Sequence, residues 1–125
     1  MRKRYDWQEL SHVECSDEDL KKLDQFSVVN NVNMAAVELK LNNYANAKYC
    51  CSEALRLDNN CSKAYFRRGQ AQIALKNYED AINDLKKAHE LIPDNKYILN
   101  ELNRGKQLLA EYNRNQMKKL KNLFN

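Results

Sequence analysis

The chain has 125 residues, of which 43% are hydrophobic and 30% charged, and its formal net charge is +4 at pH 7. This composition fits one water-soluble domain, and two glycines with one proline leave little room for sheets, so an all-α fold is predicted. The charge excess is too small to indicate nucleic-acid binding, and no apolar run is long enough to cross a membrane. The charged start, MRKRYDWQEL, lacks the apolar core of a signal peptide. We therefore expect a cytoplasmic protein, with the nucleus as a second compartment.

Chemistry-bearing side chains are few. The chain has four cysteines, at Cys15, Cys50, Cys51 and Cys61. Their spacing is not that of a zinc site, so buried thiols are favoured over metal or redox chemistry. His12 and His89 are not paired with any nucleophile or ligand set. The sequence predicts no catalytic residue, no metal site and no cofactor.

The elements follow one another with short connections. In chain order we predict a short helix over residues 1–10, a linker over 11–15, and helices over 16–41, 44–57, 63–76, 79–91 and 96–123. Ser16, with Asp19 three residues later, is typical of a helix N-cap. Asp94 is the predicted cap of the last helix, because it follows Pro93 directly.

A sequence repeat organises the middle of the chain. The matching pairs are Leu41 and Leu75, Asn43 and Asn77, Tyr44 and Tyr78, Ala47 and Ala81, Ala54 and Ala88, and Leu57 and Leu91. A helix–turn–helix unit with this period, about 34 residues, is the signature of the tetratricopeptide (TPR) repeat. Gly69 falls at the small-residue position of that pattern, and it indicates a close helix contact because glycine costs a helix about 1 kcal/mol relative to alanine.

We therefore predict a single TPR domain over residues 1–125. Residues 1–15 would be a remnant of a first repeat with a linker, 16–61 a second repeat, 62–95 a third repeat, and 96–125 a long C-terminal capping helix. The apolar positions of that last helix are Ile98, Leu102, Leu109, Tyr112, Leu120 and Phe124. They are expected to cover the last repeat, since a stack of repeats needs a cap.

Several segments resemble one TPR subclass. Residues 31–35 (NVNMA), 63–69 (KAYFRRG) and 120–124 (LKNLF) are similar to the C-terminal TPR domains of the large immunophilins, which include TPR-bearing cyclophilins and FKBP-type isomerases. Residues 81–93 (AINDLKKAHELIP) are most similar to the cyclophilin branch. The resemblance implies a co-chaperone module whose parent protein would carry a peptidyl-prolyl isomerase domain, whereas this chain itself is not an enzyme.

The resemblance also implies a ligand. In that family five polar residues form a carboxylate clamp for the C-terminal acidic peptide of heat-shock protein 90, with heat-shock protein 70 as an alternative partner. Three of the five positions match Asn33, Lys63 and Arg67. The other two belong to the first helix of the first repeat, which this chain is expected to lack, so a partial clamp is predicted. Lys40 and Gln70 are further candidates for the same groove.

The physics of these residues leaves two interpretations open. Lys63 and Arg67 lie one helical turn apart, where like charges repel, and Lys63 sits in a first turn, where the helix dipole disfavours a cation. A bound anion would relieve both costs. Asn33 and Arg67 are separated by one repeat length, so stacking is expected to bring them side by side. The alternative is a solvated basic face that also includes Arg68.

Other interpretations concern apolar surface. Phe66 is predicted to be a packing residue. Without a first helix, apolar surface would be exposed around Val28, Val29, Val32 and Val37, so a homo-oligomer or an assembly role is the alternative function. Residues 117–124 (MKKLKNLF) interleave basic and apolar side chains, which is compatible with a calmodulin-binding or membrane-surface helix. An ordinary capping helix is favoured over both.

Overall fold

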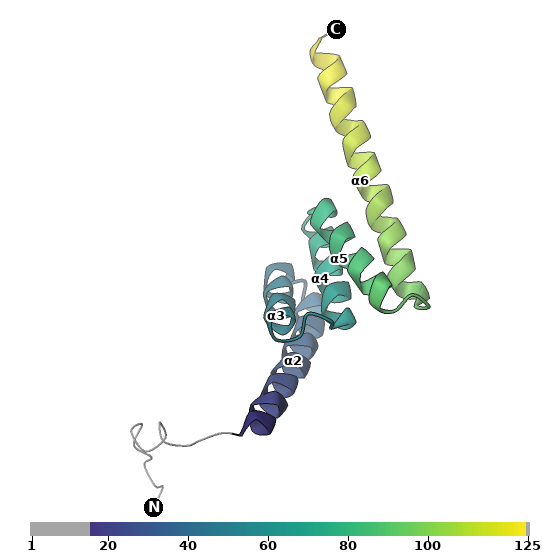
Figure 1. Ribbon diagram of the computed structural model, residues 1–125. Helices are drawn as coiled ribbons and strands as arrows, with labels where there is room; N and C mark the ends of the chain where they lie inside the picture. The colour runs from purple at the N-terminus through teal and green to yellow at the C-terminus, as the bar shows by residue number, and fades with distance from the viewer. Residues whose placement is uncertain (1–15, 125) are drawn as a thin grey trace, which may run out of the picture.

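The computed structural model describes residues 16–124, and the regular structure within them is helical. The helices are α2 (Asp17–Lys40), α3 (Tyr44–Leu57), α4 (Ser62–Ala74), α5 (Tyr78–Leu91) and α6 (Lys96–Leu123). They pack in chain order, and the start of α2 and the end of α6 project from opposite ends of the molecule (Figure 1). The all-α fold of helix–turn–helix repeats is confirmed. The predicted helix over residues 1–10, together with His12 and Cys15, lies outside the described residues.

Helix α4 is the centre of the packing, because it contacts α2, α3, α5 and α6. One apolar cluster lies among α2, α3 and α4, and a second lies among α4, α5 and α6. The helices approach closely because most residues at their contacts are small. The alanines with no exposed surface are Ala35, Ala47, Ala54, Ala64, Ala71, Ala81 and Ala88.

Gly69 marks the tightest of these approaches. A Cβ atom at this position would lie 2.7 Å from Cγ of Leu85, a side chain of α5 that is fully buried. The close helix contact predicted from Gly69 is therefore confirmed. Gly105 of α6 differs, since a Cβ atom there would lie 3.4 Å from its nearest neighbour, Cγ1 of Ile82.

Replacing each glycine by alanine tests this difference. Gly69→Ala should lower the free energy of unfolding by about 1–3 kcal/mol, because the methyl group overpacks against Leu85. Gly105→Ala is the matched control and should be neutral or stabilising by up to about 1 kcal/mol, because alanine favours the helix and fits. Urea unfolding measures both, and equal effects of the two changes would contradict the packing assigned to Gly69.

The two turns within the repeats have the same backbone geometry. Asn42 and Lys76, which lie at equivalent positions of the two repeats, both adopt positive φ, at 60° and 64°. In each turn the following amide closes the helix: Asn43 N–H donates to the Glu38 carbonyl, and Asn77 N–H donates to the Gln72 carbonyl, both at 2.8 Å. This is the Schellman arrangement, in which glycine or asparagine is preferred and lysine is strained.

Lys76→Asn should therefore raise the free energy of unfolding by about 0.5–1 kcal/mol, because asparagine tolerates the left-handed backbone better than lysine. Asn42→Lys, the reverse exchange at the equivalent turn, should lower it by a similar amount. Thermal unfolding of both variants against the parent chain makes the comparison. A destabilised Lys76→Asn variant would show that the Lys76 side chain contributes more than its backbone costs.

Two sequence-based expectations need correction. Asn95, and not Asp94, caps α6, since its Oδ1 accepts hydrogen bonds from the amides of Tyr97 and Ile98. Val28 and Val32 are buried against α3 and α4, so the expected exposed apolar surface includes only Val29 and Val37 of the four valines. The predicted cap of α2 is confirmed, because the Ser16 side chain accepts a hydrogen bond from the Asp19 amide.

The last helix covers the repeat with only part of its length. Ile98, Leu102 and Gly105 are buried, whereas Leu120 and Phe124 are exposed because α6 extends past α4 and α5 (Figure 1). In residues 16–124, no helix combines the length and apolar composition that crossing a bilayer requires.

The cysteines inside the described residues are free thiols. Cys51 is fully buried in the cluster of α2, α3 and α4, and Cys50 and Cys61 are half-buried beside it. Burial raises the pKa of Cys51 to about 12. Burial, helped by the nearby Glu38, also raises the pKa of Cys50. In the described part of the chain, no three potential ligands among His, Cys, Asp and Glu gather into a metal site.

Candidate functional site: a basic groove between α4 and α6

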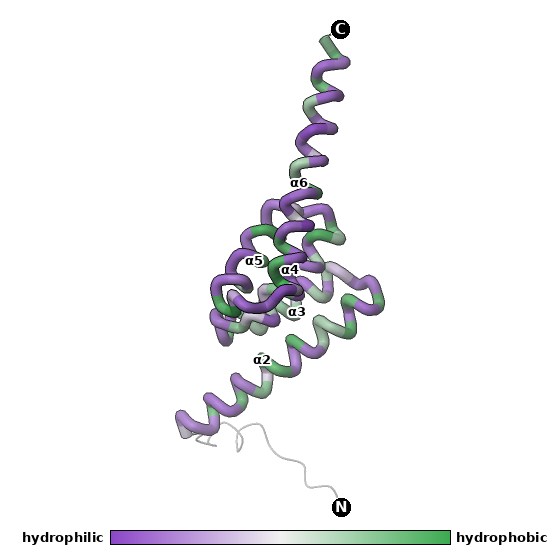
Figure 2. Tube along the Cα trace, turned by 90° about the vertical axis from the view of Figure 1, so that its right-hand side faces the viewer, coloured by the Kyte–Doolittle hydropathy of each residue, from purple (hydrophilic) through white to green (hydrophobic). Residues whose placement is uncertain are grey.

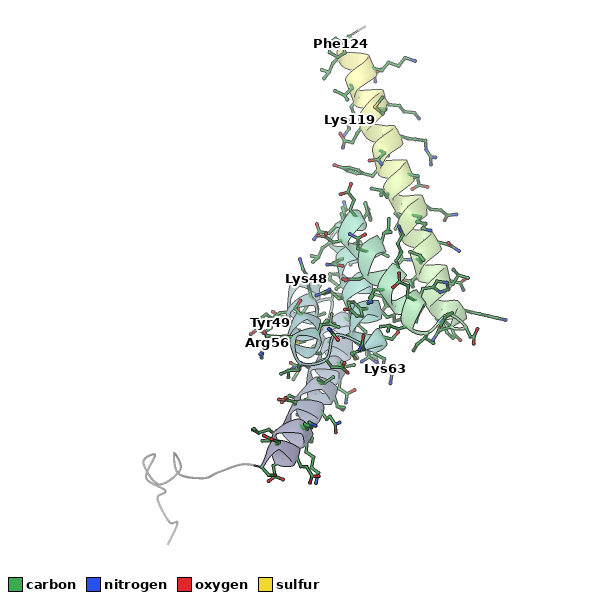
Figure 3. The ribbon with its side chains drawn as sticks, in the orientation of Figure 1. Lys48, Tyr49, Arg56, Lys63, Lys119 and Phe124 are labelled. Carbon is green, nitrogen blue, oxygen red and sulfur yellow. The ribbon has the colours of Figure 1, made fainter. Side chains whose placement is uncertain are left out.

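A groove of about 300 Å³ lies where α4 begins and where the chain enters α6. Its lining residues are Ser62, Lys63, Phe66, Arg67, Ile92, Asn95, Tyr97 and Ile98. Lys63 stands at the exposed start of α4 (Figure 3). The groove thus combines two cationic side chains with a largely apolar wall, an arrangement that suits a peptide carrying both a carboxylate and an aliphatic side chain.

Arg67 is held in place by a neighbouring helix. Its Nη1 donates a 2.6 Å hydrogen bond to the backbone carbonyl of Val32 in α2, and the side chain is half-buried. One guanidinium nitrogen is therefore used to fix the group, while a guanidinium has further N–H donors for a ligand. Asn33, which follows Val32 directly, is exposed on α2. Asn33 does not line the groove, and its contact with a ligand beside Arg67 stays a prediction.

The start of α4 differs from those of α2 and α6. Cys61 occupies its N-cap position and makes no side-chain capping hydrogen bond, as is also true of Asn43 at α3 and Asn77 at α5, whereas Ser16 and Asn95 cap α2 and α6. The first turn of α4 contains no acidic residue and does contain Lys63. Uncapped amide groups and a nearby cation both favour an anion at this end of the helix.

The other two predicted groove residues, Gln70 and Lys40, lie away from the groove between α4 and α6. Gln70 is half-buried on α4, one turn beyond Phe66 and Arg67, and Lys40 is exposed at the end of α2. Neither lines the groove between α4 and α6. Their contact with a ligand stays a prediction.

Sequence reasoning did not identify the residues that form the apolar wall of the groove. Phe66, predicted as a packing residue, packs partly against the cluster of α4, α5 and α6 and also lines the groove. Tyr97 and Ile98 come from the first turn of α6, and Ile92 from the connection before it. The Pro93 signal places a turn there, but only the folded structure shows that the turn returns to the start of α4.

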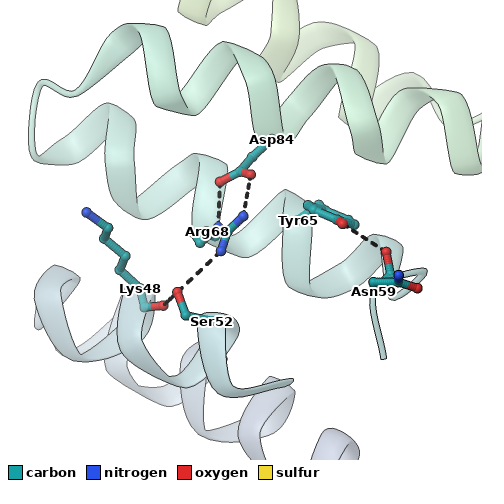
Figure 4. Close-up of polar contacts among 6 residues, drawn as sticks. All are labelled: Lys48, Ser52, Asn59, Tyr65, Arg68 and Asp84. Atoms are coloured by element: carbon teal, nitrogen blue, oxygen red, sulfur yellow. Dashed lines mark hydrogen bonds and ion pairs between the residues drawn. The ribbon is translucent and has the colours of Figure 1, made fainter. Parts of the chain in front are cut away.

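Arg68 belongs to the core and not to the basic face. Its Nε and Nη2 donate to the two carboxylate oxygens of Asp84 in α5, both at 2.7 Å, and its Nη1 donates to Oγ of Ser52 in α3 at 3.3 Å (Figure 4). Tyr65 lies under the guanidinium, with its ring centroid 5.8 Å from Cζ. The hydrogen bond to Asp84 raises the pKa of Arg68. The interpretation of Arg68 as part of a solvated basic face is therefore wrong.

Breaking this pair should be costly. Asp84→Asn should lower the free energy of unfolding by about 2–3 kcal/mol, because it leaves the partly buried Arg68 without its counter-charge. Glu53→Gln breaks the more exposed pair of Glu53 with Arg56 and should cost less than about 1 kcal/mol. Chemical denaturation compares them, and a cost for Asp84→Asn no larger than that of the control would refute a central role for the pair.

Comparisons with known proteins agree with this architecture. Residues 62–95 match the family model described as tetratricopeptide repeat. The first TPR domain of human RPAP3 superimposes with a TM-score of 0.69 at 35% identity, covering 73% of this chain and 72% of that one. The first TPR of Spaghetti (RPAP3), bound to the HSP90 peptide SRMEEVD, gives a TM-score of 0.65 at 37% identity, covering 66% of each chain. The second TPR domain of human RPAP3, in complex with the HSP70 peptide SGPTIEEVD, gives a TM-score of 0.61 at 34% identity, covering 63% of this chain and 66% of that one.

The chain therefore belongs to the tetratricopeptide repeat family, whose helical-repeat fold is not catalytic. Within it, the chain is similar to FK506-binding immunophilins. It is 36% identical over 109 residues to FK506-binding protein 59 of Drosophila melanogaster, covering 87% of this chain and 24% of that protein. It is 38% identical over 81 residues to the isomerase FKBP4 of Bos taurus, covering 65% of this chain and 18% of that protein. The immunophilin resemblance is confirmed for the FKBP type, and the cyclophilin branch is not supported.

Proposed function

We propose that this chain is a co-chaperone module that binds the C-terminal acidic peptide of heat-shock protein 90 in the groove between α4 and α6. The observation that carries the proposal is the placement of Lys63 and Arg67 on one groove beside an apolar wall. Two of the similar TPR structures hold peptides of heat-shock proteins 90 and 70 that end in EEVD. The heat-shock protein 70 peptide is therefore the second ligand to test.

Binding would combine ionic contacts to the terminal carboxylates of the peptide with apolar contacts to its aliphatic side chain. Lys63 and the free donors of Arg67 pair with the terminal carboxylates, and the uncapped amides at the start of α4 add to the positive potential. Asn33 donates from α2, next to the anchored Arg67. Phe66 and Ile98 supply the apolar wall that takes the aliphatic side chain preceding the terminal aspartate.

The first test is calorimetry with the peptide SRMEEVD. Lys63→Ala should weaken binding by about 1.5–3 kcal/mol, the usual contribution of a hydrogen bond to a charged group, which is about 10–100-fold in affinity. Amidation of the peptide C-terminus should have an effect of the same size. Because the contacts are ionic, added salt should also reduce affinity.

Lys86→Ala is the matched control, since Lys86 is exposed on α5 and does not line the groove. It should leave the affinity unchanged. Equal binding by the parent chain and the Lys63→Ala variant, or no discrimination between free and amidated peptide, would refute the carboxylate contact.

The parent protein of this module and its cellular location are also proposals. The chain spans less than a quarter of FK506-binding protein 59 and FKBP4, and both of those proteins are named as FK506-binding or isomerase proteins. We infer a role beside a peptidyl-prolyl isomerase domain, supported by these similarities. We also propose that the module acts in the cytoplasm. Fractionation of cells expressing the tagged gene product checks the location.

A further inference from the structure

Besides its two cationic side chains, the groove between α4 and α6 has a third polar group, the side-chain amide of Asn95. Asn95 is half-buried and is held at two points. Its backbone N–H donates to the Ile92 carbonyl at 3.4 Å, which closes a turn over residues 93–94. Its Oδ1 accepts hydrogen bonds from the amides of Tyr97 and Ile98, at 2.9 and 3.2 Å. The Asn95 side chain is therefore fixed in one orientation.

This orientation leaves the amide nitrogen of Asn95 available to a ligand. Two backbone N–H groups can pair only with the oxygen of a side-chain amide, so the cap also identifies which branch is Nδ2. Because the oxygen faces the first turn of α6, the nitrogen is turned away from that helix, at a residue that lines the groove. In the part of the chain that the structure describes, Nδ2 has no hydrogen-bond partner.

The two walls of the groove are fixed relative to each other. Ser62 is buried at the start of α4, and its Oγ donates to the Ala88 carbonyl near the end of α5 at 3.3 Å. The connection that follows α5 carries Asn95, and Figure 2 shows its hydrophilic stretch, residues 94–96, on the side that faces the viewer. The separation between the cations of α4 and Nδ2 of Asn95 is thus set by hydrogen-bonded structure on both sides, as a preorganised binding site requires.

The donors of the groove differ in charge, and this difference indicates what each of them binds. No carboxylate lines the groove, so a ligand has to bring the acceptors. Lys63 and Arg67 are cations and are matched by carboxylates, whereas Nδ2 of Asn95 is a neutral donor. A main-chain carbonyl is the neutral acceptor that every peptide carries. In an extended peptide, successive carbonyls point to opposite edges, so every second one faces the same wall.

We propose that Asn95 is a further peptide-binding residue, whose Nδ2 donates to a main-chain carbonyl of the acidic peptide. That carbonyl precedes the terminal carboxylates that Lys63 and Arg67 bind. The contact rests on the proposed function, because it belongs to the same groove and the same peptide. Since it engages the backbone of the ligand and no side chain, it fixes the position and direction of the peptide along the groove.

Asn95→Ser tests this contact, because serine keeps the helix cap, as Ser16 does at α2, and removes the nitrogen. In calorimetry of the full chain with SRMEEVD, the variant should bind about three- to tenfold more weakly than the parent chain, as expected for loss of one neutral hydrogen bond. Asn95→Asp also keeps the cap but turns a carboxylate oxygen toward the acidic peptide, so it should weaken binding by more than about tenfold. Thermal unfolding of both variants should show midpoints no lower than that of the parent chain.

Asn77→Ser is the matched control, because Asn77 holds the N-cap position of α5, is exposed and does not line the groove. It should bind the peptide like the parent chain. The ratio of the affinities for free and amidated peptide should be the same in Asn95→Ser and in the parent chain, because the contact is not made to the carboxylate. A smaller ratio in Asn95→Ser would place Asn95 on the carboxylate and overturn the assignment to a main-chain carbonyl.

Lys63→Ala, measured in the same series, separates the two ways in which the result can be negative. Parental affinity of Asn95→Ser, or of Asn95→Asp, together with weakened binding by Lys63→Ala would overturn the Asn95 contact and leave the proposed function intact. Unchanged binding by Lys63→Ala, or no binding by the parent chain, would overturn the proposed function and the Asn95 contact with it.

Discussion

The bidentate ion pair of Arg68 with Asp84 is the constraint on which the arrangement of the helices depends. It joins α4 to α5, and the third contact of Arg68, with Ser52, adds α3. A charged pair with so little exposure is stable only when its geometry is good and its remaining donors are used, and both conditions are met here. Since α4 contacts every other described helix, fixing its rotation fixes which of its side chains face the core and which face the groove.

Helix α4 both packs against the core and presents side chains to the groove, and it does so with few residues. One face presents Gly69 and Ala71 to its neighbours, where no larger side chain would fit at the glycine. Another face presents Lys63 and Arg67 to the groove. The small residues let the helices approach closely, and this closeness brings the Val32 carbonyl within reach of Arg67. The positioning of the basic groove is thus a consequence of how tightly the alanines and the glycine pack.

Periodicity made most of the fold predictable. The alignment of the two repeats located the turns at Asn43 and Asn77, and the helix over residues 44–57 has the predicted bounds. The site was predictable only where it follows the repeat: Lys63 and Arg67 do meet on one groove, whereas the wall from Ile92 to Ile98 depends on how the chain turns back, which no local pattern encodes. Arg68 was misassigned because a basic neighbour on a helix gives no sign of a partner sixteen residues away.

The burial of Cys51 has a consequence for how the repeat can be observed. With a pKa near 12, this thiol is protonated at neutral pH, and its burial between α2, α3 and α4 keeps reagents away. Alkylation must therefore wait until α3 separates from its neighbours, so its rate reports how often that separation occurs. Cys51 is thus a native probe of local opening next to the Ser52 contact. Mass spectrometry can measure its alkylation rate without any added label.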